Sequence, residues 1–293
     1  MVNEDSWRVQ RDTVKKCLKM AADQYEADAY FINAQMTPEA TDSLMREIED
    51  NKQCGNCVLF LTTDGGYPHA AFRMANAIRL FYPKGKFILF VLGRCKSAGT
   101  LVAVGADEIV MGAFGEFGPL DAQLPKKDNV HWRQSGLNTV ECFKKLNDEL
   151  TSCFWKSFYS LLQKSGGIIT TSTAADIASK LSIGLFAPVS RKIDAIEFVD
   201  VQRATEEILD YALRLTKTTA RPLRDEKIRH FIHGYRSHGF AIDFSEAIQI
   251  FSSPVKFLPI EYKDLEYYCY DIVRKSISPY RIVEYVASHG KNN

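Results

Sequence analysis

Ser97 stands at a place in the chain where a serine side chain can act as a nucleophile. It follows residues 87–92, an apolar run of strand length, and Ala98 and Gly99 behind it open a short apolar helix. A serine at such a strand-to-helix junction is held exposed above a helix N-terminus, which is what covalent catalysis requires. A lone Ser-Ala-Gly is otherwise an ordinary helix N-cap, so the assignment needs a second feature.

The second feature is a glycine turn that follows the preceding strand. Residues 56–62 form a continuous apolar run, and Asp64, Gly65 and Gly66 come shortly after it. Glycines let a backbone N–H approach a substrate carbonyl, and the N–H of Ala98 can complete an oxyanion hole. Because the carboxyl ends of parallel strands meet at one edge of a sheet, we expect the two turns to be neighbours. The pair indicates acyl transfer.

The elements that must position these turns alternate between strand and helix. This alternation predicts repeated βαβ units, and hence an α/β fold with a parallel sheet and helices outside it. A threonine followed by a proline marks the start of the second helix. The predicted strands cover residues 30–34, 56–62, 86–92 and 108–111, and the predicted helices among them cover 7–25, 38–49 and 69–81.

The chain changes character after Asp121. Residues 125–140 are polar and predict a surface excursion, and an amphipathic helix is predicted over 139–164. The region 221–293 is rich in tyrosine, and aromatic residues on that scale are typical of a docked subdomain or a subunit interface. The predicted domains are an N-terminal helix over 1–27, a central domain over 28–220 and a helical C-terminal extension over 221–293. Further helices are predicted over 173–181, 202–215, 224–232 and 243–251.

The composition excludes several classes of protein. The 293 residues are 46% hydrophobic and 25% charged, which fits a globular protein with a sizeable core. A formal net charge of +1 gives no sign of a nucleic-acid partner. No apolar run is long enough to span a membrane and no signal peptide is evident, so we expect a cytoplasmic setting. Seven cysteines, Cys54-x-x-Cys57 among them, predict reduced thiols, and we expect neither a metal nor a cofactor.

Residues 95–123, CKSAGTLVAVGADEIVMGAFGEFGPLDAQ, resemble the serine dehydrogenase proteinase family. That family is a branch of the Clp protease and signal peptide peptidase A superfamily. The sequence LTTDGG at 61–66 is similar to the oxyanion turn of the family, and 184–204 and 234–243 are similar to its later stretches. The resemblance covers roughly residues 25 to 255 and implies a ClpP/crotonase-type fold, with 28–220 as the catalytic domain.

The resemblance also implies roles for individual residues. Ser97 takes the place of the nucleophile, and Gly66 and Ala98 take the places of the oxyanion N–H donors. The chain departs from the family in having Cys95 and Lys96 before the serine, where small residues are common. It also lacks the proline of the family's D-x-P-G-G turn.

The general base is the next question. Clp proteases use a histidine just past the second strand, but no histidine lies between Gly99 and Asp121. Signal peptide peptidases use a lysine from a downstream helix, and a lysine acts as a base only when burial lowers its pKa. The helix predicted over 139–164 offers Lys156, which lies among aromatic residues and is favoured, and then Lys145. Asp121 and His238 match polar positions of the family, and we treat them as candidate supporting residues.

Together these features predict a serine hydrolase, a soluble peptidase that acts on peptides or proteins through a Ser97–Lys156 dyad and an acyl-enzyme. We expect a homo-oligomer, since members of the resembled superfamily form closed oligomers. The alternative is a non-catalytic oligomeric scaffold or binding protein of the same fold. A third hypothesis, an enoyl-CoA hydratase-like enzyme, is weaker because acyl-thioester binding has no need of a nucleophilic serine.

Overall fold

The computed structural model describes residues 4–126, 129–191, 195–267 and 282–288. The chain divides into two compact units, of which unit 1 comprises Met1–Asp121 and Glu207–Asn293 and unit 2 comprises Ala122–Glu206. Unit 1 contains every strand predicted from the sequence and both turns. The domains expected from the sequence, 1–27, 28–220 and 221–293, stay a prediction.

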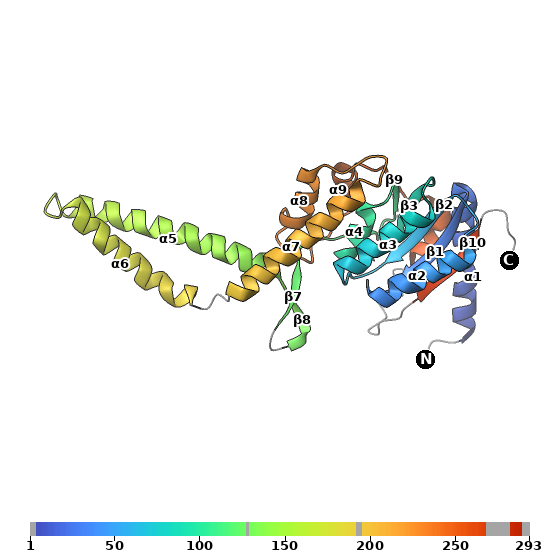
Figure 1. Cartoon of the computed structure of the whole chain (residues 1–293), viewed down its shortest axis with the longest axis horizontal. Helices are drawn as coiled ribbons and strands as arrows, with labels where there is room; N and C mark the ends of the chain where they lie inside the picture. Colours follow the sequence, from blue (N-terminus) through green and yellow to red (C-terminus); the bar gives the residue numbers. More distant parts are fainter. Residues whose placement is uncertain (1–3, 127–128, 192–194, 268–281, 289–293) are drawn as a thin grey trace. The chain divides into compact units, whose positions relative to one another are not determined.

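Unit 1 is organised around a sheet in the order β10-β1-β2-β3-β5-β9 (Figure 1). All of its strands are parallel except β10, which is antiparallel to β1. The predicted α/β fold with repeated βαβ units is therefore confirmed. The strands are β1 (Ala27–Asn33), β2 (Asn56–Thr62), β3 (Phe87–Val91), β5 (Glu108–Met111), β9 (Val255–Phe257) and β10 (Ile282–Ser288).

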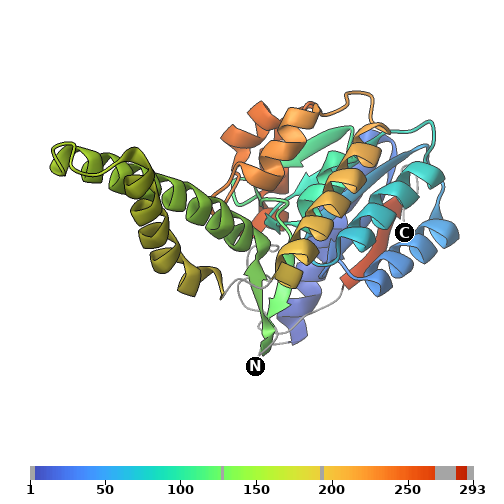
Figure 2. The same ribbon diagram turned by 60° about the vertical axis from the view of Figure 1, so that its left-hand side comes forward.

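Because β1, β2, β3 and β5 lie side by side in chain order, right-handed crossovers place the connecting helices on one face. Figure 2 shows α2, α3 and α7 side by side over the sheet, and Phe72 of α3 stacks on Tyr211 of α7 at 4.6 Å between ring centroids. The helices of unit 1 are α1 (Glu4–Tyr25), α2 (Pro38–Asn51), α3 (Pro68–Phe81), α4 (Ala98–Val104), the second half of α7 (Ala195–Thr216), α8 (Asp225–His233) and α9 (Phe244–Ile250).

The opposite face of the sheet is covered by α1 and by residues 258–265. Phe31, Phe60 and Phe90 project from successive strands into this layer and are buried, together with Leu18 of α1. Neighbouring residues along each strand face the other helices, so every strand of the centre is apolar on both sides. This explains why the sequence shows continuous apolar runs in place of an alternating pattern.

The C-terminal region contributes strands as well as helices. The prediction of a helical extension over 221–293 is therefore incomplete, since β9 pairs with β5 and β10 pairs with β1. Strands β9 and β10 lie far from their partners in sequence, so no local sequence pattern predicts the pairing. The two strands form the two edges of the sheet in the described part of the chain.

Unit 2 contains a β-hairpin, two helices and the first half of α7. The hairpin pairs β7 (Gln123–Lys126) with β8 (Asn129–Ser135) where a polar excursion was expected. It is followed by α5 (Gly136–Lys164) and α6 (Thr171–Ser190), and α6 continues nine residues beyond its predicted end, through Pro188. No helix among the described residues has the length and apolar character needed to cross a membrane.

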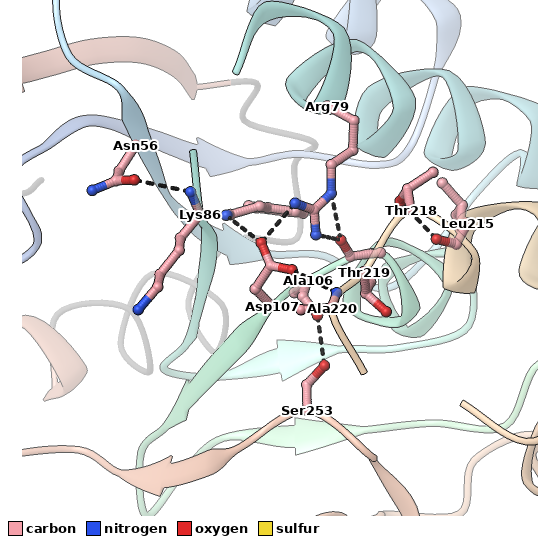
Figure 3. A network of polar contacts seen from close by, with 12 residues as sticks. Asn56, Arg79, Lys86, Ala106, Asp107, Leu215, Thr218, Thr219, Ala220 and Ser253 are labelled. Atoms are coloured by element: carbon pink, nitrogen blue, oxygen red, sulfur yellow. Dashed lines mark hydrogen bonds and ion pairs between the residues drawn. The ribbon is translucent and has the colours of Figure 1, made fainter. Parts of the chain in front are cut away.

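A mostly buried ion pair lies at the amino ends of the central strands (Figure 3). Arg79 Nη1 lies 2.6 Å from Asp107 Oδ2, and the same guanidinium donates to the Gly105 carbonyl at 2.6 and 3.2 Å. Asp107 also accepts from the N–H of Phe87 at 2.9 Å and that of Ala220 at 3.4 Å. One carboxylate thus ties α3, β3 and the segment after α7 together.

We expect Arg79→Met to lower the free energy of unfolding by about 3 kcal/mol, because it leaves a mostly buried carboxylate without its charged partner. Arg73→Met, on the same helix, is the matched control. Arg73 pairs with Asp42 at 2.8 Å with both side chains nearly half exposed, so its loss should cost less than about 1 kcal/mol. Urea unfolding measures both, and equal losses would contradict the assignment.

Candidate active site

Ser97 lies between the two-residue strand β4 (Arg94–Cys95) and α4, as the sequence predicts. Its backbone has φ +49° and ψ −112°, a conformation that non-glycine residues rarely adopt. Such strain persists only where the surrounding contacts enforce it, and it is frequent at nucleophiles on tight turns. The conformation is therefore a structural sign of function that the sequence pattern alone does not contain.

The glycine turn lies directly against this serine. Backbone hydrogen bonds join the two turns, from Thr63 N to Arg94 O at 2.7 Å and from Lys96 N to Thr63 O at 3.0 Å. A Cβ atom placed on Gly65 would lie 2.9 Å from Ser97 Cβ and 3.4 Å from Ser97 Oγ. The structure thus brings together the two turns that the sequence placed on successive strands, and only glycine fits at position 65.

Two further residues fix the shape of the glycine turn. The Thr63 hydroxyl accepts from Gly65 N at 3.1 Å, a local turn that needs no tertiary contact. Met36 donates its N–H to Gly65 O at 2.8 Å, and its carbonyl accepts from Tyr67 N at 2.7 Å. It is therefore hydrogen-bonded to the residues on both sides of Gly66. Sequence analysis did not identify either residue. Thr63 could have been found from its place before Asp-Gly-Gly, whereas Met36 carries no such signal.

The N–H groups of Gly66 and Ala98 are available to a ligand. Within the part of the chain that the structure describes, neither donates a hydrogen bond, whereas the N–H of Gly65 is engaged by Thr63. Ala98 is the first residue of α4, so its N–H belongs to the free donors of a helix start. Both groups flank the contact between Gly65 and Ser97, and they can act as donors to a developing oxyanion.

Asp121 and His238 form a close pair in unit 1. Asp121 Oδ1 lies 2.6 Å from His238 Nδ1, and the aspartate side chain is fully buried while the histidine is about one quarter exposed. The two residues are 117 positions apart in sequence. Sequence analysis named both as supporting candidates, and the structure adds that they act on each other.

The segment leading to Asp121 runs beside the serine. A Cβ atom on Gly118 would lie 3.4 Å from Ser97 N, and Gly118 donates to and accepts from the hydroxyl of Thr100 at 3.2 and 2.7 Å. The loop that carries His238 is bound to the same segment, because Phe117 and Ile242 exchange two backbone hydrogen bonds of 3.0 Å. The Asp121–His238 pair is therefore built on the chain that adjoins the Ser97 turn.

The predicted lysines occupy a different setting. Lys156 and Lys145 both lie on α5 in unit 2, and both side chains are exposed. Aromatic rings do surround Lys156 in sequence, and Phe154 and Phe158 stack on each other at 6.0 Å between centroids. An exposed lysine lacks the burial on which a lysine base depends.

Cys95 is the other nucleophilic side chain near Ser97. It is fully buried, and this burial raises the pKa of the Cys95 thiol well above its usual value, although the Lys96 ammonium opposes the shift. The neutral thiol is a poor nucleophile, so Cys95 does not compete with the serine. Among the described residues, no group of His, Cys, Asp or Glu side chains is arranged to hold a metal ion.

Comparison with known proteins assigns neither a family nor an activity to the chain. No protein-family model matches the chain, and no curated protein does. The chain is similar to a serine-to-alanine mutant of 1510-N, a membrane-bound stomatin-specific protease, with 15% identity and a TM-score of 0.48 over 82% of this chain and 83% of that chain. A lysine-to-alanine mutant of 1510-N, in complex with a substrate peptide, gives 18% identity and a TM-score of 0.33 over 83% and 96%. Values this low do not define an activity, so the function is inferred from the chain's own residues.

We expect Gly65→Ala to lower the reactivity of Ser97 about 100-fold, because the added methyl group must displace the serine side chain. Gly55→Ala is the control, since a Cβ atom at Gly55 meets nothing within 4 Å. The rate of labelling by a serine-directed fluorophosphonate measures the effect. Equal labelling of the two variants would contradict the close approach of the turns.

The strain at Ser97 predicts a difference between two substitutions that both remove the hydroxyl. Ser97→Gly should be more stable to unfolding than Ser97→Ala by about 1 kcal/mol, because glycine adopts this backbone conformation without strain. Chemical denaturation of the two variants measures the difference. If the alanine variant is equally stable, the positive φ carries no strain.

Proposed function

We propose that this protein is a serine hydrolase that cleaves peptide bonds through an acyl-enzyme on Ser97. The observation that carries the proposal is the contact between a strained serine and a glycine turn, next to the N–H groups of Gly66 and Ala98, which have no acceptor among the described residues. A nucleophile beside two preorganised donors is what acyl transfer requires. The choice of a peptide as substrate rests on the resemblance of residues 95–123 to a proteinase family.

The geometry supports His238 as the general base. An ionised carboxylate only accepts hydrogen bonds, so in the proposed arrangement His238 Nδ1 donates to Asp121 and Nε2 has the lone pair. A buried aspartate that orients an imidazole in this tautomer is the second half of the Ser-His-Asp arrangement. The chain order Ser97, Asp121, His238 is one of several in which this arrangement occurs.

With these roles the steps are as follows. Ser97 Oγ attacks the carbonyl carbon of the substrate while its proton passes to His238 Nε2. The carbonyl oxygen becomes an anion that Gly66 and Ala98 stabilise with their N–H groups. The imidazolium then gives its proton to the leaving amine, and a water molecule attacks the ester by the same route to release the acid.

Lys156, the base favoured from the sequence, is here the second candidate, and Lys145 is the third. The aromatic residues around Lys156 in the sequence are the reason for keeping it as a candidate, and Phe154 packs on Trp155 and Phe158. The exposure of Lys156 in unit 2 argues against it. A scaffold protein without activity stays the alternative from another class, and it predicts that Ser97 does not react at all.

Labelling by a fluorophosphonate probe separates these possibilities. Wild type should be labelled on Ser97, Ser97→Ala should not, and His238→Ala should be labelled about 10²- to 10⁴-fold more slowly, as expected for loss of a general base. Asp121→Asn should also slow labelling. Lys156→Ala should behave like Lys164→Ala, a control at another exposed position of the same helix.

Two outcomes would overturn parts of this proposal. Loss of labelling in Lys156→Ala, with His238→Ala unaffected, would transfer the base to the lysine. A folded wild type that is not labelled would remove the hydrolase assignment and leave the scaffold. Circular dichroism of each variant shows that the fold is intact.

A further inference from the structure

Lys96 stands next to the nucleophile in sequence, and its side chain is largely buried at 12% exposure. Three oxygens surround its ammonium group at 3.1 Å each: Glu116 Oε1, the Phe117 carbonyl and the Phe240 carbonyl. An ammonium group has three N–H donors, so each donor has one acceptor. All three donors of the Lys96 ammonium group are thus directed at partners within the protein.

The three acceptors come from two separate segments of the chain. Glu116 and Phe117 form β6 (Glu116–Phe117), which pairs with β4, whereas Phe240 belongs to the loop that carries His238. The Phe117 carbonyl also accepts the N–H of Ile242 at 3.0 Å, so it bonds to the loop and to the lysine at once. Lys96 therefore joins β6 to the loop, which it contacts at Phe240, two residues after His238.

The stem of Lys96 passes over the segment that leads to Asp121. A Cβ atom on Gly118 would lie 2.8 Å from Lys96 Cδ and 3.4 Å from Lys96 Cβ. The lysine methylene groups thus use the space that the absence of a side chain at Gly118 provides. One side chain contacts the segments of both members of the Asp121–His238 pair, and its own backbone precedes Ser97.

We propose that Lys96 is a positioning residue that clamps the 234–243 loop onto β6, so that His238 stays paired with Asp121 beside Ser97. The effect on catalysis rests on the proposed function, whereas the effect of Lys96 on the position of the loop does not. Lys96 differs from a simple surface ion pair because it bonds to two backbone carbonyls, one in β6 and one in the loop. Among the described residues, the loop has one backbone bridge to β6, between Ile242 and Phe117, and Lys96 adds a second link at Phe240.

The test compares Lys96→Met, which keeps the length of the stem and removes the charge and the donors, with Lys86→Met. Lys86 is exposed, directly precedes β3 at the amino ends of the strands, and serves as the control. Two measurements are made on each protein: hydrogen exchange at the amides of Phe117 and Ile242, and the low-field proton resonance of His238 Nδ1–H in histidine-labelled protein. In Lys96→Met, exchange should be at least about tenfold faster at these two amides, and the resonance should weaken or vanish.

The catalytic consequence is measured by the rate of fluorophosphonate labelling of Ser97. Lys96→Met should be slower by about 100-fold, the effect of displacing a catalytic group by roughly 1 Å, and Lys96→Arg should recover part of the rate. The double variant Lys96→Met/Glu116→Gln leaves no unpaired carboxylate behind. It should be as slow as the single variant, since the loop is released in both.

Each outcome decides one question. If hydrogen exchange and the His238 resonance are unchanged in Lys96→Met, the proposed clamp is overturned. It is also overturned if exchange is faster in Lys96→Met but Ser97 is labelled at the wild-type rate. Recovery of full activity in the double variant also overturns it, since the defect would then arise from the orphaned Glu116. If wild type is not labelled at all, the proposed function fails, while exchange and the His238 resonance still decide whether Lys96 holds the loop.

Discussion

The close approach of Gly65 to Ser97 is the constraint on which the rest of the site depends. Two turns from neighbouring strands can meet only if those strands are parallel and in register, because only then do their carboxyl ends share one edge. The pairing of β2 with β3 satisfies this condition, with Cys57 opposite Phe87 at the start of both strands. The two hydrogen bonds of Thr63 then bring the turns within contact distance.

The opposite edge of the sheet serves a different purpose. There the Arg79–Asp107 pair joins helix, strand and loop, and it leaves the carboxyl edge free for chemistry. The polar groups at the amino ends of the strands differ from those at the carboxyl ends in how many of their hydrogen bonds are formed within the protein. Asp107 accepts hydrogen bonds from Arg79, Phe87 and Ala220, whereas the N–H groups of Gly66 and Ala98 have no acceptor among the described residues.

Much of the fold could be predicted because its signals are local. The continuous apolar run at residues 56–62 matches β2, and the Thr37 cap accepts from Ala40 N at the start of α2. The same holds for the turns at Gly65 and Ser97, since glycine content and a strand-to-helix junction are visible in the sequence. Local physical preference and final structure agree at these places.

Features that depend on distant partners could not be predicted. Strands β9 and β10 are short or flanked by polar residues, and only their neighbours in the sheet make them strands. The Asp121–His238 pair joins residues that no spacing rule connects, and the role of Lys96 requires knowledge of three acceptors from two segments. The start of unit 2 at Ala122 coincides with the change of character after Asp121, whereas its end at Glu206 lies inside α7 and has no such signal in the sequence.

The 117 positions between Asp121 and His238 have a consequence for biosynthesis. A ribosome adds about 5–20 residues per second, so the imidazole emerges on the order of ten seconds after the aspartate. During that interval the nascent chain can form the strands and turns around Ser97 without a histidine beside them. With the roles proposed above, the emerging chain carries its nucleophile before its base.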